Sequence, residues 1–478
     1  MTFATLLNQQ QVERVHEASL EILEEVGLKV RFEPARELFK QHGCSVEEER
    51  VRFPRAVVEK YRKMYPSSFT FYARDPKFDK TIPQDSPVIV TASSAPDIID
   101  PVTGAERRAT SSDIVRIAHL VNEMPGYDVF SISTLADDAP ADQFTISRLY
   151  PALKYCRKPI RVTTTDMKDT KSVMDLTYLV AGGEEAYKEH PFLTHHYCPV
   201  VSPLTMDNLS TENVMYFAKE GLPVYPTIVP NAGLTSPMSM AGTIAQGNAE
   251  FLAAATLMQM CKEGTPLIYA TLGTVADMRT GAYASGGIEC GMLHMAYAQM
   301  AHYYNVPCGG YIGLTNSKLN DAQAGYESGM SGIAGVLAGM DMFNIGGLID
   351  ALKTFDFAKA VIDDEMALMM KRMKRGVNFS EEELAVDLIK ETGPGGSFIV
   401  NPHTMKRMKT EAILTKMADR DARVAWEKKG SMDIHARAMN RVREIMTQNT
   451  DPLISSDMDE KLHAAFPGMV SGLLEPIS

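Results

Sequence analysis

Short apolar runs alternate with longer amphipathic stretches over most of the chain. The runs are rich in β-branched and aromatic residues and are bounded by Gly, Pro or Asn, which predicts buried strands. They span residues 87–93, 127–134, 159–165, 192–198, 223–229, 266–272, 307–314 and 341–348. The stretches between them carry apolar residues at helical spacing, as in SSDIVRIAHLVNEM after the first run. The pattern therefore predicts eight strands, each followed by a helix.

Strands that alternate with helices indicate βαβ units and a parallel sheet. Eight such units over residues 87–375 match an α/β protein of the (β/α)8 TIM-barrel type, whose usual length is about 250 residues. An open doubly wound sheet is the alternative, but no GxGxxG follows an early strand and no GxxxxGK[ST] occurs. We therefore expect a TIM barrel whose site lies in the loops after the strands.

Two flanking regions complete the predicted organisation. Residues 1–86 form an N-terminal helical/β elaboration, in which an apolar stripe predicts a helix that ends at Gly27 and alternation over 68–74 predicts strands. Residues 376–478 form a C-terminal helical extension that we expect to pack on the barrel. Within it, Ser380 is placed as the N-cap of a helix that has Glu383 at its third position.

Composition and charge exclude several classes of protein. The 478 residues are 45% hydrophobic and 23% charged, which is typical of a globular protein and not of a disordered or collagen-like chain. Forty-eight Lys and Arg against 60 Asp and Glu give a net charge of −12, so we expect no nucleic-acid or membrane partner. No apolar run approaches the ~20 residues that span a bilayer, and the N-terminus becomes polar too early for a signal peptide. These features predict a cytoplasmic protein.

The cysteines and histidines give little indication of a metal site. Six cysteines lie far apart and form no CxxC pair, so we interpret them as buried free thiols. Cys198 lies beside His195 and His196, but a fourth zinc ligand would have to come from another segment. We therefore expect no metal bound by this chain.

The predicted strand ends carry neutral polar and aromatic side chains. They lack the paired carboxylates of a glycosidase and the histidine cluster of a metal-dependent hydrolase. HHY at 195–197 is the most polar of these ends, although one of two adjacent strand residues must point away from the barrel axis. Aromatic faces could come from Tyr197, Tyr225, Tyr269, Tyr311, Phe355 and Phe357. Core packing is the alternative for each of them, and Asp356 could be only a helix N-cap.

Three segments carry the most specific motifs of the chain. They are PNAGLTSPMSMAGTIAQGNAEFLAAATLMQMCKEGTPLIYATLGTVADMRTGAYASGGIE at 230–289, GLTNSKLNDAQAGYESGM at 313–330 and LNQQQVERVHEASLEILEEVGLKV at 7–30. These segments resemble the trimethylamine methyltransferase superfamily. The resemblance implies a TIM barrel that passes a methyl group from a methylamine to the cobalt of a separate corrinoid protein. It also implies a role in anaerobic metabolism.

One departure from this family bears on the substrate. The trimethylamine-specific members carry pyrrolysine, whereas residues 314–320 read LTNSKLN and the whole chain uses the ordinary amino acids. The members without pyrrolysine demethylate quaternary amines, so the resemblance implies glycine betaine, with carnitine, proline betaine and γ-butyrobetaine as alternatives. A non-catalytic betaine-binding protein is a second hypothesis, and a barrel enzyme of unrelated chemistry is a third.

The implied chemistry suggests roles for the strand-end residues. A quaternary nitrogen leaves as a neutral amine, so no catalytic acid or base is needed. The cation would bind aromatic faces, and the carboxylate would bind hydrogen-bond donors or a positive group. The expected cage residues are Tyr197, Tyr225, Phe355 and Phe357, and the expected carboxylate ligands are His195, His196, Asn231 and Asn316. Arg161, Arg279 and Lys318 are alternative anion partners.

The expected partners follow from the same resemblance. No DxHxxG motif occurs, so we expect no tightly bound cofactor and place the cobalamin on a corrinoid partner protein that docks at the barrel mouth. The other partner is a small quaternary amine. The small residues of 325–340 fit either a homo-oligomer interface or tight packing of a helix on the sheet.

Overall fold

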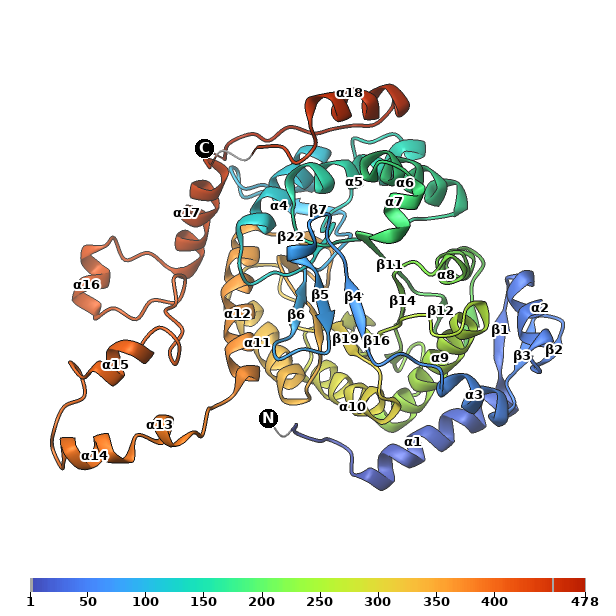
Figure 1. The fold of residues 1–478 in the computed structure, drawn as a ribbon, viewed down its shortest axis with the longest axis horizontal. Helices are drawn as coiled ribbons and strands as arrows, with labels where there is room; N and C mark the ends of the chain where they lie inside the picture. Colours follow the sequence, from blue (N-terminus) through green and yellow to red (C-terminus); the bar gives the residue numbers. More distant parts are fainter. Residues whose placement is uncertain (1–2, 449–450, 478) are drawn as a thin grey trace.

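A closed parallel barrel forms the centre of the computed structural model, which describes residues 3–448 and 451–477 (Figure 1). In sheet order its strands are β6 (Val88–Val90), β20 (Met342–Asn344), β19 (Cys308–Tyr311), β16 (Tyr269–Thr271), β14 (Val224–Ile228), β11 (Leu193–Tyr197), β10 (Ile160–Val162) and β9 (Phe130–Ser131). A parallel bridge from Val90 to Val129 joins the first strand to the last. Each strand lies within one of the eight apolar runs, so the predicted TIM barrel is confirmed.

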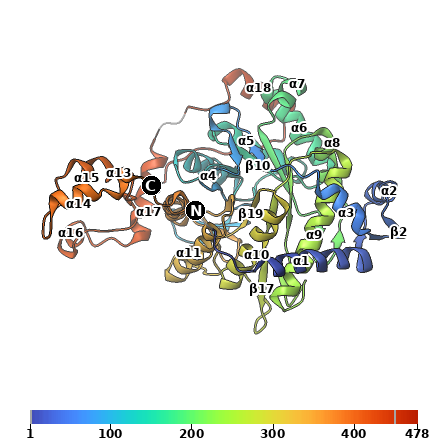
Figure 2. The same cartoon turned by 60° about the horizontal axis from the view of Figure 1, so that its bottom comes forward.

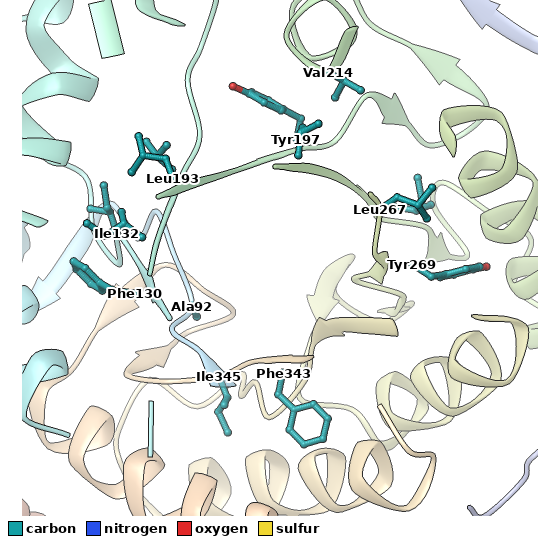
Figure 3. Close-up of a cluster of buried hydrophobic side chains, with 14 of the residues drawn as sticks. Ala92, Phe130, Ile132, Leu193, Tyr197, Val214, Leu267, Tyr269, Phe343 and Ile345 are labelled. Carbon is teal, nitrogen blue, oxygen red and sulfur yellow. The ribbon is translucent and has the colours of Figure 1, made fainter. Parts of the chain in front are cut away.

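A ring of helices surrounds the barrel, one after each strand (Figure 1). They are α4 (Ser111–Glu123), α5 (Phe144–Tyr155), α6 (Met167–Ala181), α8 (Leu209–Glu220), α9 (Met240–Cys261), α10 (Ile288–Tyr304), α11 (Ala322–Leu337) and α12 (Phe357–Arg375), with the short α7 (Glu184–Glu189) between α6 and β11. Because successive strand residues point to opposite faces, alternate side chains meet these helices. Phe130, Leu193, Tyr269 and Phe343 point outward in this way (Figure 3).

An antiparallel hairpin closes the end of the barrel where the strands begin. It consists of β4 (Phe69–Phe71) and β5 (Lys80–Ile82), and it lies across the middle of the barrel in Figure 1. Phe69 and Phe71 are buried in one cluster with interior residues of four barrel strands, among them Tyr225 and Met342. Both phenylalanine rings meet the Tyr225 ring edge-on. The barrel is therefore filled by apolar side chains at this end.

Small sheets flank the opposite end, where the strands finish. The strands β15 (Asn231–Ala232), β17 (Thr274–Asp277) and β18 (Ala282–Ala284) form one sheet that continues from β14 and β16. The strands β21 (Leu348–Ile349), β22 (Thr354–Phe355), β7 (Asp97–Ile99) and β8 (Glu106–Arg108) form another, which follows β20 and β6. The site of a TIM barrel lies at this end.

The N-terminal region combines helices with a small sheet. Its helices α1 (Gln9–Glu21), α2 (Glu33–Gln41) and α3 (Arg55–Arg62) pack on α9, with a π-helical turn at Ile22–Val26. The strands β1 (Leu28–Val30), β2 (Ser45–Glu47) and β3 (Arg50–Arg52) join β12 (Val200–Val201) and β13 (Thr205–Met206) in one sheet. The apolar stripe predicts α1 but not the strands β1–β3, of which β1 pairs with a segment far along the chain.

The C-terminal region has two parts that differ in their contacts. The helix α17 (Ile434–Met446) packs on α12 and α4, and α18 (Ser456–Ala465) packs on α6. In contrast, α13 (Glu381–Leu384), α14 (Val386–Thr392), α15 (Pro402–Arg407) and α16 (Arg423–Lys428) form an arm that projects from the barrel (Figures 1 and 2). In the described residues, we find no helix with the length and apolar character needed to cross a membrane.

Candidate active site

A buried arginine lies inside the barrel among neutral polar groups. Arg161 is the middle residue of β10, it is 1% exposed, and it belongs to the inward-facing set of that strand. Its guanidinium donates hydrogen bonds to hydroxyl or amide oxygens from five other segments of the barrel. The acceptors are Ser131 Oγ at 2.9 Å, Tyr225 Oη at 2.7 Å, Asn344 Oδ1 at 3.0 Å, Tyr311 Oη at 3.1 Å and Ser93 Oγ at 3.4 Å.

The Arg161 side chain keeps its positive charge in this position. Burial acts to lower its pKa, but the hydroxyls of Tyr225 and Tyr311 outweigh that effect and hold the pKa above its usual value. The partners named above are all neutral, and none is a carboxylate. An unpaired charge away from water is costly, and such groups cluster at functional sites. The arrangement therefore favours binding of an anion beside Arg161.

His196 is an uncharged neighbour of this arginine. Its ring centroid lies 5.3 Å from that of Tyr225 and 6.1 Å from that of Tyr311. Burial, with a further contribution from Arg161, lowers the pKa of His196 well below its usual value. The imidazole is therefore neutral at physiological pH. Its Nδ1 lies 3.4 Å from Thr163 Oγ1, and its buried Nε2 has no hydrogen-bond partner among the described residues.

Further buried polar atoms near the strand ends have no partner in the described part of the chain. They include Asn344 Nδ2, Thr227 Oγ1 and Asn231 Oδ1. The Asn344 amide is the one whose oxygen accepts a hydrogen bond from Arg161, and Thr227 lies two residues after Tyr225. Buried polar groups are nearly always hydrogen-bonded, so several unsatisfied ones on β14, β15 and β20 indicate a place for a ligand or for water. Together with Arg161, Asn344 Nδ2 and Thr227 Oγ1 provide donors suited to a small anion such as a carboxylate, whereas Asn231 Oδ1 can only accept a hydrogen bond.

The structure brings together part of the residue set predicted from the sequence. Tyr225 and His196 face the interior. Tyr225 accepts a hydrogen bond from Arg161, and the His196 ring lies beside the Tyr225 ring. Arg161 itself was predicted as an alternative anion partner. Asn231, at the start of β15, is buried with a free amide oxygen. The amide of Asn316 is already engaged: Nδ2 donates to Tyr283 O at 2.8 Å, and Oδ1 accepts from Gly286 N at 2.8 Å.

The other predicted residues lie away from Arg161. His195 stacks on Phe217 of α8 with ring centroids 3.6 Å apart, and Tyr197 points outward as well (Figure 3). This follows from strand alternation, because His196 between them points inward. Phe355 of β22 and Phe357, the first residue of α12, are buried edge-to-face against each other and are not among the partners of Arg161.

The two other alternative anion partners are solvent-exposed and paired. The Arg279 side chain is 87% exposed and binds Asp277, and the Lys318 side chain is 72% exposed and binds Asp350. Tyr311 was predicted only as a possible aromatic face, and Asn344 was assigned no role in binding the cation or the carboxylate. A charged residue in the middle of the apolar run PIRVTTT was the signal that could have placed Arg161 first, since parallel barrel strands are normally apolar.

The family model of the trimethylamine methyltransferases (MTTB) matches residues 1–467. The chain belongs to this methyltransferase family. Three relatives are similar over nearly their whole length. The glycine betaine methyltransferase of Desulfitobacterium hafniense (strain Y51) is 33% identical over 462 residues, which is 96% of each chain. A trimethylamine methyltransferase of Desulfitobacterium hafniense (strain DSM 10664 / DCB-2) is 31% identical, over 92% of this chain and 89% of its own. That of Methanosarcina barkeri is 27% identical, over 97% and 96%.

This methyltransferase offers few groups for metal binding or proton transfer at its site. Within residues 3–448 and 451–477, no group of three or more His, Cys, Asp or Glu is arranged to hold a metal ion. The ionisable groups around the barrel interior include the charged Arg161, the neutral His196, and Tyr225, whose pKa burial raises to about 12. These groups can bind and orient a substrate without exchanging a proton with it at neutral pH.

Proposed function

We propose that this member of the family transfers a methyl group from glycine betaine to the Co(I) of a corrinoid protein. The observation that carries the proposal is the buried, unpaired positive charge of Arg161 in the barrel. A carboxylate of the methyl donor would neutralise that charge, and it would accept a hydrogen bond from Nη2 in place of Ser93 Oγ, the most distant of the present acceptors at 3.4 Å. The relative that shares 33% of its residues with this chain is named glycine betaine methyltransferase, which supports the same substrate.

The charge of Arg161 argues against trimethylamine as the substrate. Trimethylamine is largely protonated at neutral pH and has no anionic group. At an effective dielectric constant of about 20, two positive charges about 5 Å apart repel by roughly 3 kcal/mol. Glycine betaine carries a similar cation, but its carboxylate lies one methylene away and can stand between the ammonium and the guanidinium. A donor that joins a quaternary ammonium to a carboxylate therefore suits this site better.

The reaction requires positioning more than acid–base catalysis. Co(I) of the partner is a co-substrate that attacks one methyl carbon, the carbon–nitrogen bond breaks, and the electron pair stays on nitrogen. The products are neutral dimethylglycine nitrogen and a methyl-Co(III) corrinoid, and no proton moves. The chain's contribution is to fix the carboxylate at Arg161, so that a methyl group faces the open end of the barrel in line with the acceptor.

An anaerobic methyl-transfer assay tests this proposal. The purified protein is mixed with a Co(I) corrinoid protein and glycine betaine, carnitine, proline betaine, γ-butyrobetaine or trimethylamine in turn. We expect the absorbance change of methyl-Co(III) formation with glycine betaine and none with trimethylamine. Binding of glycine betaine without any methyl transfer would instead identify a betaine-binding protein. Transfer from trimethylamine alone would contradict the role of Arg161.

A further inference from the structure

A tyrosine from a hairpin beyond the strand ends reaches the same end of the barrel. Tyr283 is the middle residue of β18, which pairs antiparallel with β17. The strand β17 follows β16 of the barrel and pairs in parallel with β15, which follows β14. The hairpin extends beyond the barrel wall, where β17 is labelled in Figure 2. Two barrel strands thus support the segment that carries Tyr283.

The Tyr283 ring belongs to an apolar group next to Arg161. It packs against a buried cluster of Leu272, Tyr311 and Leu314, which come from the ends of neighbouring barrel strands. Tyr311 connects this cluster to the polar interior, because its hydroxyl accepts a hydrogen bond of 3.1 Å from Arg161 Nη2. Burial raises the pKa of Tyr283, so its ring is that of a neutral phenol. An aromatic and aliphatic layer therefore adjoins the positive charge of Arg161.

Asn316 holds Tyr283 in this layer through the backbone. Its side chain bridges Tyr283 and the residue three positions later, with Nδ2 donating to Tyr283 O and Oδ1 accepting from Gly286 N. The Asn316 loop is fixed in turn by the carboxylate of Glu327, which accepts from Asn316 N at 2.8 Å. This asparagine therefore acts on the hairpin and not on a ligand.

We propose that Tyr311 and Tyr283 form the wall that contacts the trimethylammonium group and selects it over an uncharged group of the same shape. The inference rests on the proposed function, in which Arg161 holds the carboxylate of a betaine. One methylene separates the carboxylate from the ammonium, so the cation must lie in the layer next to Arg161, which Tyr311 and its cluster occupy. Aromatic faces attract quaternary ammonium ions. Asn316 is a positioning residue for this wall.

Two ligands of the same shape separate the wall from the carboxylate anchor. In 3,3-dimethylbutyrate, carbon replaces the nitrogen of glycine betaine, so the carboxylate and the three methyl groups remain and the positive charge is lost. Titration calorimetry of the full chain with each ligand gives the ratio of their dissociation constants. This ratio reports the attraction of the wall for the charge, and it is insensitive to a general loss of binding.

Substitutions at the wall should change this ratio. We expect Tyr283→Leu to reduce the preference for glycine betaine by about 3- to 30-fold, which corresponds to a cation–π contribution of about 0.5–2 kcal/mol. Tyr283→Phe should keep the preference, because it retains the ring. Asn316→Ala should reduce it in the same direction as Tyr283→Leu. The control is Tyr326→Leu, on an α11 residue that is 57% exposed, and it should leave the ratio unchanged.

Each outcome either supports or overturns the inference. An unchanged ratio of dissociation constants for Tyr283→Leu, including equal weakening of the binding of both ligands, would overturn it. If Tyr283→Leu does not fold, Tyr311→Leu and Asn316→Ala carry the same comparison. Arg161→Met separates this result from the proposed function. If Arg161→Met weakens the binding of both ligands but the wall variants leave the ratio of dissociation constants unchanged, Arg161 binds the carboxylate and the inference about the wall is wrong. When neither ligand binds, or neither responds to Arg161→Met, the proposed function fails and the wall fails with it.

Discussion

Replacement of Arg161 by methionine should reverse the ligand preference of the site. Methionine has a similar length and an apolar side chain, so it removes the positive charge and leaves the interior filled. Glycine betaine would lose the partner of its carboxylate. Choline, which has the same trimethylammonium group but no carboxylate, would lose only a repulsive neighbour. The two ligands should therefore respond in opposite directions.

The structure sets the size of this effect. Arg161 is 1% exposed, so water cannot replace it as the partner of a bound carboxylate. A hydrogen bond to a charged group contributes about 1.5–3 kcal/mol. The dissociation constant for glycine betaine should thus rise about 10- to 150-fold, since each 1.4 kcal/mol is a factor of ten. The dissociation constant for choline should stay the same or fall, because about 3 kcal/mol of repulsion at 5 Å is removed.

Titration calorimetry with both ligands measures the change directly. The matched control is Arg279→Met, because the Arg279 side chain is 87% exposed and already pairs with Asp277. We expect this control to leave both dissociation constants unchanged. Thermal unfolding of each variant shows whether the barrel is intact. If Arg161→Met weakened both ligands equally, or left glycine betaine binding intact, the carboxylate would not bind at Arg161.

Four further predictions concern the scaffold. Burial lowers the pKa of His195 to about 3, below its value in the unfolded state. Between about pH 6.5 and 3 the unfolded state therefore binds more protons than the folded state, and the free energy of unfolding falls as the pH decreases. His195→Phe should remove about 1.4 kcal/mol per pH unit of that slope in urea unfolding, without changing betaine affinity. Gly310→Ala should destabilise by about 1–3 kcal/mol, because a Cβ there would overlap the carbonyl oxygen of the adjacent strand. Gly329→Ala, which meets no atom within 4 Å, should gain about 0.4–1 kcal/mol. Glu365→Ala should speed hydrogen exchange at the amides of 416–418, because these amides donate hydrogen bonds to the Glu365 carboxylate.

The barrel could be predicted from the sequence because its signal is local. Each barrel strand is a short apolar run between turn residues, and each surrounding helix shows its own spacing, so all eight barrel strands lie within the predicted runs. Helix caps are local as well. Ser380 and Asp356 both accept hydrogen bonds from the backbone of the helices that they begin. Such features need no knowledge of distant contacts.

The arrangement of the site depends on contacts that the sequence pattern does not contain. The partners of Arg161 are as far as 183 residues away, as with Asn344. Which of His195, His196 and Tyr197 faces inward depends on strand register, since a shift of one residue exchanges the two faces. Asn316 lies near the barrel mouth as predicted, yet its amide is used by the backbone of the hairpin. Residue type at a strand end therefore indicated the region but not the roles.

The most direct test of the account is a crystal structure of the protein with glycine betaine bound. The account predicts the carboxylate within hydrogen-bond distance of the Arg161 guanidinium, with the trimethylammonium group against Tyr311 and one methyl group toward the open end of the barrel. A carboxylate bound elsewhere, or a trimethylammonium group in contact with Arg161, would contradict the central claim.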